Sequence, residues 1–208
     1  WESFVGAGPL PMRHGLTLGE LGAWFIDALK LDVDYRVIAM QGWQPDAAPG
    51  HGWPLGERAW VNPSPNAANL WMARAYAGTV MIEGTTLSEG RGTTRPFELI
   101  GAPWVIAERF AEGMNRRAMP GVFFRPALFE PTFHKHAGKG CAGCQVHVLD
   151  RRTFQAVEAG VALIEAFRAA DPEVFRWKDP PYEYEFDKMP IDCLAGSSQL
   201  REQIDAGV

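Results

Sequence analysis

The stretch TVMIEGTTLSEGRGT, residues 79–93, constrains the fold and the function more than any other part of the chain. Its first four residues, 79–82, form a short apolar run that predicts a buried strand. The loop that follows carries two carboxylates, one arginine and three glycines. In open α/β sheets ligands bind where strands end, and glycines let a substrate approach the backbone closely. The stretch therefore favours an α/β fold with a ligand-binding loop; a charged surface turn with an internal Glu–Arg pair is the alternative.

The flanking patterns agree with an α/β class. A strand over residues 35–40 and a helix from about 67 to 76 precede the strand at 79–82, and strand–helix–strand order is typical of an α/β sheet. Beyond residue 100 the pattern changes to short strands within 121–133 and 145–149 and helices over about 105–117, 154–169 and 196–206. We therefore predict two domains, residues 1–103 and a smaller mixed α/β domain of residues 104–208.

Composition narrows the function classes. The chain has 208 residues and a net charge of -5, so it lacks the basic surface of a nucleic-acid-binding protein. No apolar run approaches the roughly 18 residues that a membrane span needs. Three cysteines are too few for a disulfide scaffold. The chain begins at Trp1 rather than at a methionine, and we expect a fragment that lacks its natural N-terminus, so localisation cannot be read from a targeting signal.

The segment before the first helix carries a candidate site. Arg13 and His14 lie on a Pro/Gly-rich loop, where a histidine can shuttle protons near neutral pH and an arginine can hold an anion. A histidine that only packs or caps is the alternative. Thr17 and Glu20 form a Thr-x-x-Glu capping box ahead of a helical pattern, which by itself explains Glu20.

Two further clusters leave their function open. His134, His136, Cys141 and Cys144 have spacings compatible with a zinc site or a redox pair, or with plain packing near a turn. Trp43, Trp53 and Trp60 could line a sugar-binding wall or fold onto the domain as a hydrophobic loop. The aromatic and acidic run at residues 182–187 alternates in a way that favours an edge strand.

Several motifs resemble one known family in order and spacing. PMRHGLTLGEL at residues 11–21 is similar to a signature of the NamZ-type exo-β-N-acetylmuramidases. The same order continues with GW, WVNPSPN, EGT, SEGRGT, PFE and GAPW at residues 42–43, 60–66, 83–85, 88–93, 96–98 and 101–104. Lys135, Cys141 and the closing Asp192-x-Leu-x-Gly-x-x-x-Leu-Arg extend the resemblance over essentially the whole chain. Several motifs in one order are more specific than any single motif.

The resemblance implies a fold and an activity. It implies a partial Rossmann-like α/β domain followed by a smaller α/β domain, with the site in a cleft between them. Members are bacterial glycoside hydrolases of cell-wall recycling that remove terminal N-acetylmuramic acid from the non-reducing end of peptidoglycan fragments, and they are commonly exported. The implied ligand is a peptidoglycan-derived muramyl saccharide, with no metal and no cofactor. Oligomeric state cannot be read from the sequence.

Glycoside hydrolysis normally uses two carboxyl groups, and this guides the assignment of roles. We assign catalysis first to Glu83, at the predicted strand end, and then to His14 and to Glu89, which could instead orient Arg91. The residues expected to bind substrate are Arg13, Arg91, Asn66, Glu20 and Trp43. Arg91 or Arg13 could hold the lactyl carboxylate of muramic acid, so Arg91→Lys is expected to raise KM.

The chain also departs from the family pattern. Members carry an upstream Phe-x-Pro-Glu-His-Gly loop, expected to supply a catalytic glutamate, and these 208 residues do not contain it. Thr86 stands where asparagine is usual, and Cys144 stands where an apolar residue is usual. Two alternatives to the hydrolase therefore stay open: a non-catalytic glycan-binding fragment, and a metal- or redox-binding module at Cys141 and Cys144.

Overall fold

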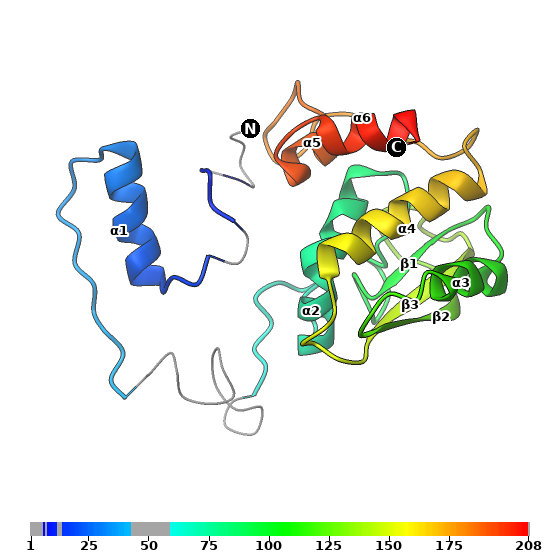
Figure 1. Ribbon diagram of the computed structural model, residues 1–208, viewed down its shortest axis with the longest axis horizontal. Helices are drawn as coiled ribbons and strands as arrows, with labels where there is room; N and C mark the ends of the chain where they lie inside the picture. Colours follow the sequence, from blue (N-terminus) through cyan, green and yellow to red (C-terminus); the bar gives the residue numbers. More distant parts are fainter. Residues whose placement is uncertain (1–5, 7, 12–13, 43–58, 208) are drawn as a thin grey trace. The chain divides into compact units, whose positions relative to one another are not determined.

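A computed structural model describes residues 6, 8–11, 14–42 and 59–207 (Figure 1). The chain divides into two compact units: a smaller one within residues 8–61, and a larger one that contains residues 62–208. Each unit is considered by itself.

The smaller unit is built around α1 (Leu18–Leu29). The predicted capping box is confirmed: the Thr17 side chain accepts from the Glu20 amide at 3.2 Å, and the Thr17 amide donates to the Glu20 carboxylate at 2.8 Å. The strand predicted over residues 35–40 is wrong, because this segment has no regular structure. The Tyr35 hydroxyl instead donates to the Gly19 carbonyl of α1 at 3.0 Å, and the Val37 side chain lies against Gly19. The alternating apolar residues therefore contact a helix rather than a partner strand.

The larger unit contains an antiparallel sheet in the order β1-β3-β2. Its strands are β1 (Leu99–Ala102), β2 (Val122–Phe129) and β3 (Cys141–Val148), with Cys144 of β3 paired with Ile100 of β1 and with Pro126 of β2. The helices of this unit are α2 (Leu70–Thr79), α3 (Ala107–Arg116), α4 (Ala156–Ala170), α5 (Pro190–Ala195) and α6 (Gln199–Ala206). The predicted α/β class is confirmed.

The strand predicted at residues 79–82 is wrong. Thr79 ends α2, and residues Val80–Gly84 continue as the 3-10 helix η1. Every residue of η1 is buried, and a short apolar run that is buried on all sides cannot be assigned to strand or helix from its periodicity. The prediction that this apolar run is buried is confirmed, and Glu83 follows it directly.

The core of the larger unit lies between the sheet and the helices. In this core α2 and α3 contact the sheet, and α4 packs against α2, α3 and η1 (Figure 1). Ile82, Ile100, Leu163 and Phe167 are all 0% exposed in this core. Packing this close accounts for the deep burial of η1 and fixes the position of the loop that follows it.

Most of the remaining elements follow the predictions. The predicted helices over about 67–76, 105–117, 154–169 and 196–206 correspond to α2, α3, α4 and α6, and the predicted strands to β2 and β3. β1 and α5 were not predicted. Residues 182–187 form a turn rather than the predicted edge strand. The domain boundary predicted between residues 103 and 104 stays a prediction. Within the described residues, no helix has the length and apolarity to cross a membrane.

Candidate active site

The loop after η1 is held against β1 and the segment after β2. The Phe97 amide donates to the Glu89 carbonyl at 2.6 Å, and Ser88 pairs with Gly101 of β1. Gly90 and Gly92 have φ values of +76° and +83°, in the left-handed region that glycine adopts without strain. A Cβ on Gly92 would lie 2.7 Å from the backbone of Phe133. The two glycines therefore allow the tight loop that the sequence predicted.

Glu83 lies at the end of η1 and uses both carboxylate oxygens. Oε1 accepts from Arg91, with a distance of 3.0 Å to Nε and a second contact to Nη2. Oε2 accepts from the Tyr182 hydroxyl at 2.8 Å. A carboxyl group that only accepts hydrogen bonds, one of them from a guanidinium, has the bonding pattern of a carboxylate anion. Glu83 is therefore an oriented anion beneath the surface.

Glu89 lies deeper, beside Arg91, Lys135 and the ring of His134. It is 0% exposed, and its Oε2 lies 2.9 Å from the Lys135 Nζ. Its Oε1 lies 3.1 Å from the His134 Nδ1 and 3.2 Å from the Arg91 Nε. Burial by itself would raise the pKa of Glu89, but hydrogen bonds from His134 and the charge of Lys135 outweigh it and lower the pKa to about 2. Glu89 is therefore an anion at any physiological pH and cannot donate a proton.

Lys135 connects the two glutamates. Its ammonium group donates to the carbonyls of Ile82 and Glu83 at 3.1 and 3.4 Å and forms an ion pair with the Glu89 carboxylate. Burial lowers the pKa of Lys135, and the charge of Glu89 opposes that shift. The neighbouring His136 bonds the Thr86 carbonyl through Nε2 at 2.8 Å, and burial lowers the pKa of its imidazole. The segment 134–136 thus fixes the backbone on which Glu83 is mounted.

Two aromatic rings, Phe97 and Tyr76, form an aromatic wall beside Arg91 and complete the cluster. The Arg91 guanidinium lies over the Phe97 ring, 5.0 Å from its centroid, and the Tyr76 ring meets Phe97 edge-on at 4.8 Å. Burial and the charge of Glu83 raise the pKa values of Tyr76 and Tyr182, so both phenols stay protonated and Tyr182 remains a donor. This arrangement can hold one carboxylate, Glu83, at a buried position between a cation and a phenol.

The structure brings together three of the predicted site residues: Glu83, Glu89 and Arg91. Asn66 lies outside this cluster's contacts, in a turn where its amide donates to the Ser64 hydroxyl at 3.3 Å. His14 and Glu20 belong to the smaller unit, where His14 Nδ1 accepts from the Leu16 amide at 3.0 Å. Arg13 and Trp43 lie outside the described residues.

Sequence reasoning assigned none of the other members of the cluster to the site; Tyr182 and His134 are the clearest cases. Tyr182 is 99 residues from Glu83 along the chain, and its run was interpreted as an edge strand. His134 was considered only as a metal ligand, although its ring contacts Glu89. For His134, the sequence did contain one signal: its neighbour Lys135 belongs to the family's motif order, which indicates that this segment lies near the site. Tyr182 had no comparable signal because its role depends on a tertiary contact.

The cysteine cluster is not a metal or redox site in the described part of the chain. Positions 141 and 144 of a strand point to opposite faces, and His134 and His136 contact Glu89 and Thr86 instead. No group of three or more potential ligands gathers among the described residues. Burial raises the pKa of the Cys141 thiol to about 11 and raises that of Cys144 further, so neither is a reactive thiolate near pH 7.

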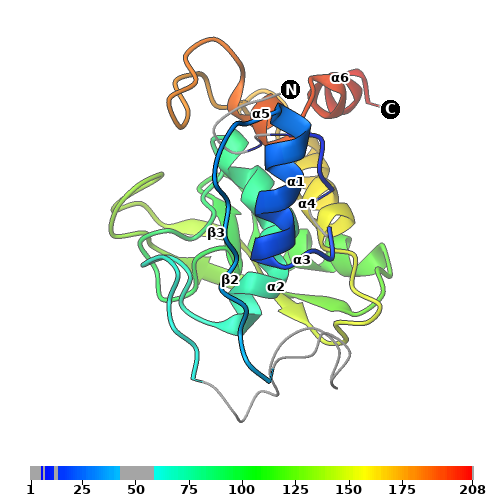
Figure 2. The same ribbon diagram turned by 90° about the vertical axis from the view of Figure 1, so that its left-hand side faces the viewer.

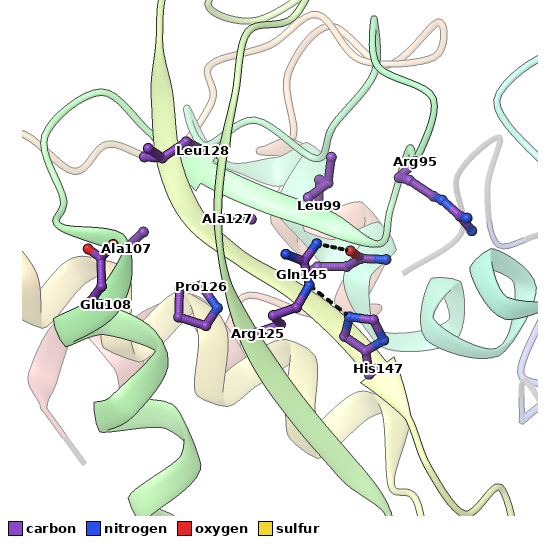
Figure 3. Close-up of a pocket in the computed structure, with 10 residues that line it drawn as sticks. All are labelled: Arg95, Leu99, Ala107, Glu108, Arg125, Pro126, Ala127, Leu128, Gln145 and His147. Carbon is purple, nitrogen blue, oxygen red and sulfur yellow. Dashed lines mark hydrogen bonds between the residues drawn. The ribbon is translucent and has the colours of Figure 1, made fainter.

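A separate groove of about 710 Å³ lies along β2 and β3 (Figure 3). Arg125 donates there to the Gln145 side chain at 2.6 Å and lies 3.4 Å from the His147 ring. Gln145 in turn donates to the buried carboxylate of Glu98 at 3.3 Å. Neither Glu83 nor Glu89 lines this groove. Its polar contacts hold Glu98 and the end of the site loop in place.

Comparison with known proteins identifies the class to which this fold and site belong. Residues 1–71 match the family model of the N-terminal part of the exo-β-N-acetylmuramidase NamZ, and residues 74–208 match the model of its C-terminal part. The chain therefore belongs to the NamZ family of exo-β-N-acetylmuramidases, and the resemblance drawn from the motifs is confirmed.

Individual relatives give the same result. The chain is 40% identical over 207 residues to the peptidoglycan β-N-acetylmuramidase NamZ of Bacillus subtilis (strain 168), a match that covers 100% of this chain and 47% of that protein. A DUF1343 family protein from Bacteroides fragilis NCTC 9343 is 26% identical with a TM-score of 0.78, over 98% of this chain and 52% of that one. A second one is 24% identical with a TM-score of 0.62, over 99% and 52%, which supports the fold alone. The chain thus spans about half the length of these relatives.

Proposed function

We propose that this chain acts as an exo-β-N-acetylmuramidase, a glycoside hydrolase that releases terminal N-acetylmuramic acid from the non-reducing end of peptidoglycan fragments. The observation that carries the proposal is the Glu83 carboxylate, held by Arg91 on one oxygen and by Tyr182 on the other. The name of the Bacillus subtilis relative supports the choice of a muramyl saccharide as the substrate.

Glu83 is the carboxylate that we assign to the reaction. An anion fixed in one orientation suits a nucleophile, or a base that activates water, because neither role requires it to carry a proton at the start. Glu89 is a positioning residue: it is fully buried, and its contacts orient Arg91 and Lys135, which hold the side chain and the carbonyl of Glu83. This revises the ranking of Glu89 among the catalytic residues while keeping it essential to the site.

Recognition of the muramyl unit is assigned to the cationic side of Glu83. The Arg91 side chain is 25% exposed, so part of its guanidinium remains accessible beside the carboxylates that it binds. The lactyl group of muramic acid is a carboxylate, which a guanidinium binds well. Roles for His14, Arg13, Asn66, Glu20 and Trp43 in binding or proton transfer remain part of the proposal.

Export of the protein is a further part of the proposal, because peptidoglycan lies outside the cytoplasm. Hydrolysis by carboxyl groups and water needs no cofactor, and we propose none. Fractionation of the native host with an antibody against this chain would test the location. A signal confined to the cytoplasmic fraction would contradict export.

The test is turnover of a chromogenic N-acetylmuramic acid β-glycoside beside its N-acetylglucosamine analogue. Release from the muramic substrate alone is expected. Glu83→Gln is expected to lower kcat by about 100-fold or more, the scale of a positioned catalytic carboxylate. Glu112→Gln is the matched control, because Glu112 is an exposed carboxylate of α3 that pairs with Arg116 on the same helix. Saccharide binding by the folded protein without release from either substrate would overturn the hydrolase and favour the glycan-binding alternative.

A further inference from the structure

A strained turn lies beside Glu83. Tyr182 and Glu185 are paired through two backbone hydrogen bonds of 2.8 and 2.9 Å, and Glu183 and Tyr184 between them have φ values of +44° and +64°. Positive φ at both central residues is the requirement of a type I′ turn, which normally takes asparagine and glycine. Non-glycine residues are strained in that conformation. A glutamate and a tyrosine in this conformation indicate a functional role for the turn.

The turn is fastened to the catalytic carboxylate. The Tyr182 hydroxyl donates to Glu83 Oε2, and the Lys178 amide just before the turn donates to the Gly84 carbonyl at 2.9 Å. The Lys178 ammonium lies over the Tyr182 ring, 5.4 Å from its centroid.

Two aromatic rings extend from this fastened turn into solvent. Tyr184 is 80% exposed and Phe186 is 71% exposed, whereas Tyr182 is buried at 8%. Figure 2 shows the loop that carries them, drawn in orange, projecting beside α5. Exposed aromatic rings beside a reactive carboxylate are suited to stack on the face of a ligand ring.

The charges around the turn limit what that ligand can be. Residues 178–188 contain four acidic side chains, Asp179, Glu183, Glu185 and Asp187, against two lysines, so the segment is net negative. Lys178 lies over the Tyr182 ring, and Lys188 pairs with Glu185 at 3.1 Å. A ligand with its own carboxylate is disfavoured there, and a neutral ring is not. The opposite side of Glu83 is cationic through Arg91. The two sides of the carboxylate therefore favour different halves of a saccharide.

We propose that Tyr184 and Phe186 form a stacking platform for the neutral N-acetylhexosamine on the leaving side of the scissile bond. This rests on the proposed function. The muramyl unit, which carries the carboxylate, lies toward Arg91, and the sugar that departs lies over the strained turn.

The test compares a substrate with a leaving sugar and one without. N-acetylmuramyl β-fluoride releases fluoride and places no ring on the platform, whereas the disaccharide of N-acetylmuramic acid and N-acetylglucosamine does. Tyr184→Ala and Phe186→Ala are each expected to raise KM for the disaccharide by about 10-fold, the scale of one ring contact, and to leave turnover of the fluoride unchanged. Phe123→Ala, which removes a 45% exposed aromatic ring of β2, is the control.

Where the wild type is active, the other kinetic results count against the platform. Equal loss on both substrates would mean that the rings act through Glu83. No loss on either, or a lower melting temperature with an unchanged KM, would mean that the rings serve packing. If the folded wild type turns over neither substrate, the proposed function fails by itself, and calorimetry with the disaccharide then decides: weaker binding by Tyr184→Ala supports the platform, and equal binding overturns it.

Discussion

At the scale of single residues, two glutamates of one loop have different environments. Glu83 is buried at 8% exposure between Arg91 and Tyr182, and Glu89 is 0% exposed and lies beside Arg91, Lys135 and the ring of His134. The sequence places both in one glycine-rich loop but says nothing of depth. Burial and the partners available at each depth decide that one can react while the other fixes the surrounding charges.

Arg91 contacts the carboxylates of both Glu83 and Glu89 through its planar guanidinium. A lysine keeps the charge but cannot bond Glu83 through two nitrogens while also approaching Glu89. Arg91→Lys is expected to lower kcat by about 10- to 100-fold, the scale of one or two charged hydrogen bonds, and to raise KM for muramyl substrates. Steady-state kinetics measures both constants. Arg95→Lys, at a half-exposed arginine whose 3.5 Å contact is to Glu98, is the control. An unchanged KM would remove Arg91 from substrate binding and leave only its positioning role.

At the scale of elements, α2 and α4 meet at two glycines. A Cβ on Gly78 would lie 1.7 Å from the carbonyl oxygen of Ala156, and one on Gly160 would lie 2.3 Å from the carbonyl oxygen of Gly78. The backbones therefore approach more closely than any other residue would permit. Both helices also contact η1. The close contact between α2 and α4 therefore fixes the position of η1 in the core and, with it, the position of Glu83.

Gly78→Ala is expected to destabilise the protein by about 1–3 kcal/mol or more, because backbone must move to accept the methyl group. Gly113→Ala is the matched control. Gly113 lies inside α3 with open space where its Cβ would be, so alanine there is expected to be neutral or to stabilise by up to about 1 kcal/mol. Urea denaturation of both variants measures the difference. Equal stability of the two would contradict the close contact between α2 and α4.

At the scale of the whole molecule, Glu89 links segments that are distant in sequence. Its partners come from the loop at residue 91 and from residues 134–135, which follow β2. The stability of this assembly depends on pH because the pKa of Glu89 falls from an ordinary 4.5 to about 2 on folding. The stabilisation is complete above about pH 4.5 and is lost as the pH falls toward 2. The shift corresponds to about 3 kcal/mol.

Glu89→Gln is therefore expected to be less stable than the wild type by about 3–5 kcal/mol at pH 7, since it leaves buried cations without their anion. The difference should shrink as the pH approaches 2, because the wild-type carboxylate becomes protonated. Urea denaturation at pH 7, 4 and 3 measures it. Glu112→Gln, at an exposed carboxylate, should show no such trend. A difference that stays constant from pH 7 to pH 3 would contradict the assigned role of Glu89.

The sequence by itself determined the α/β class, most helices, the capping box at Thr17, the loop of Glu83, Glu89 and Arg91, and the family. These are local patterns or ordered motifs, and both are written directly in the chain. Only the tertiary structure decided that residues 80–84 are helical, because a run buried on all sides carries no periodicity that separates strand from helix. It also decided that Tyr182 and His134 join the site and that the cysteines do not, since these outcomes depend on which distant segments pack together.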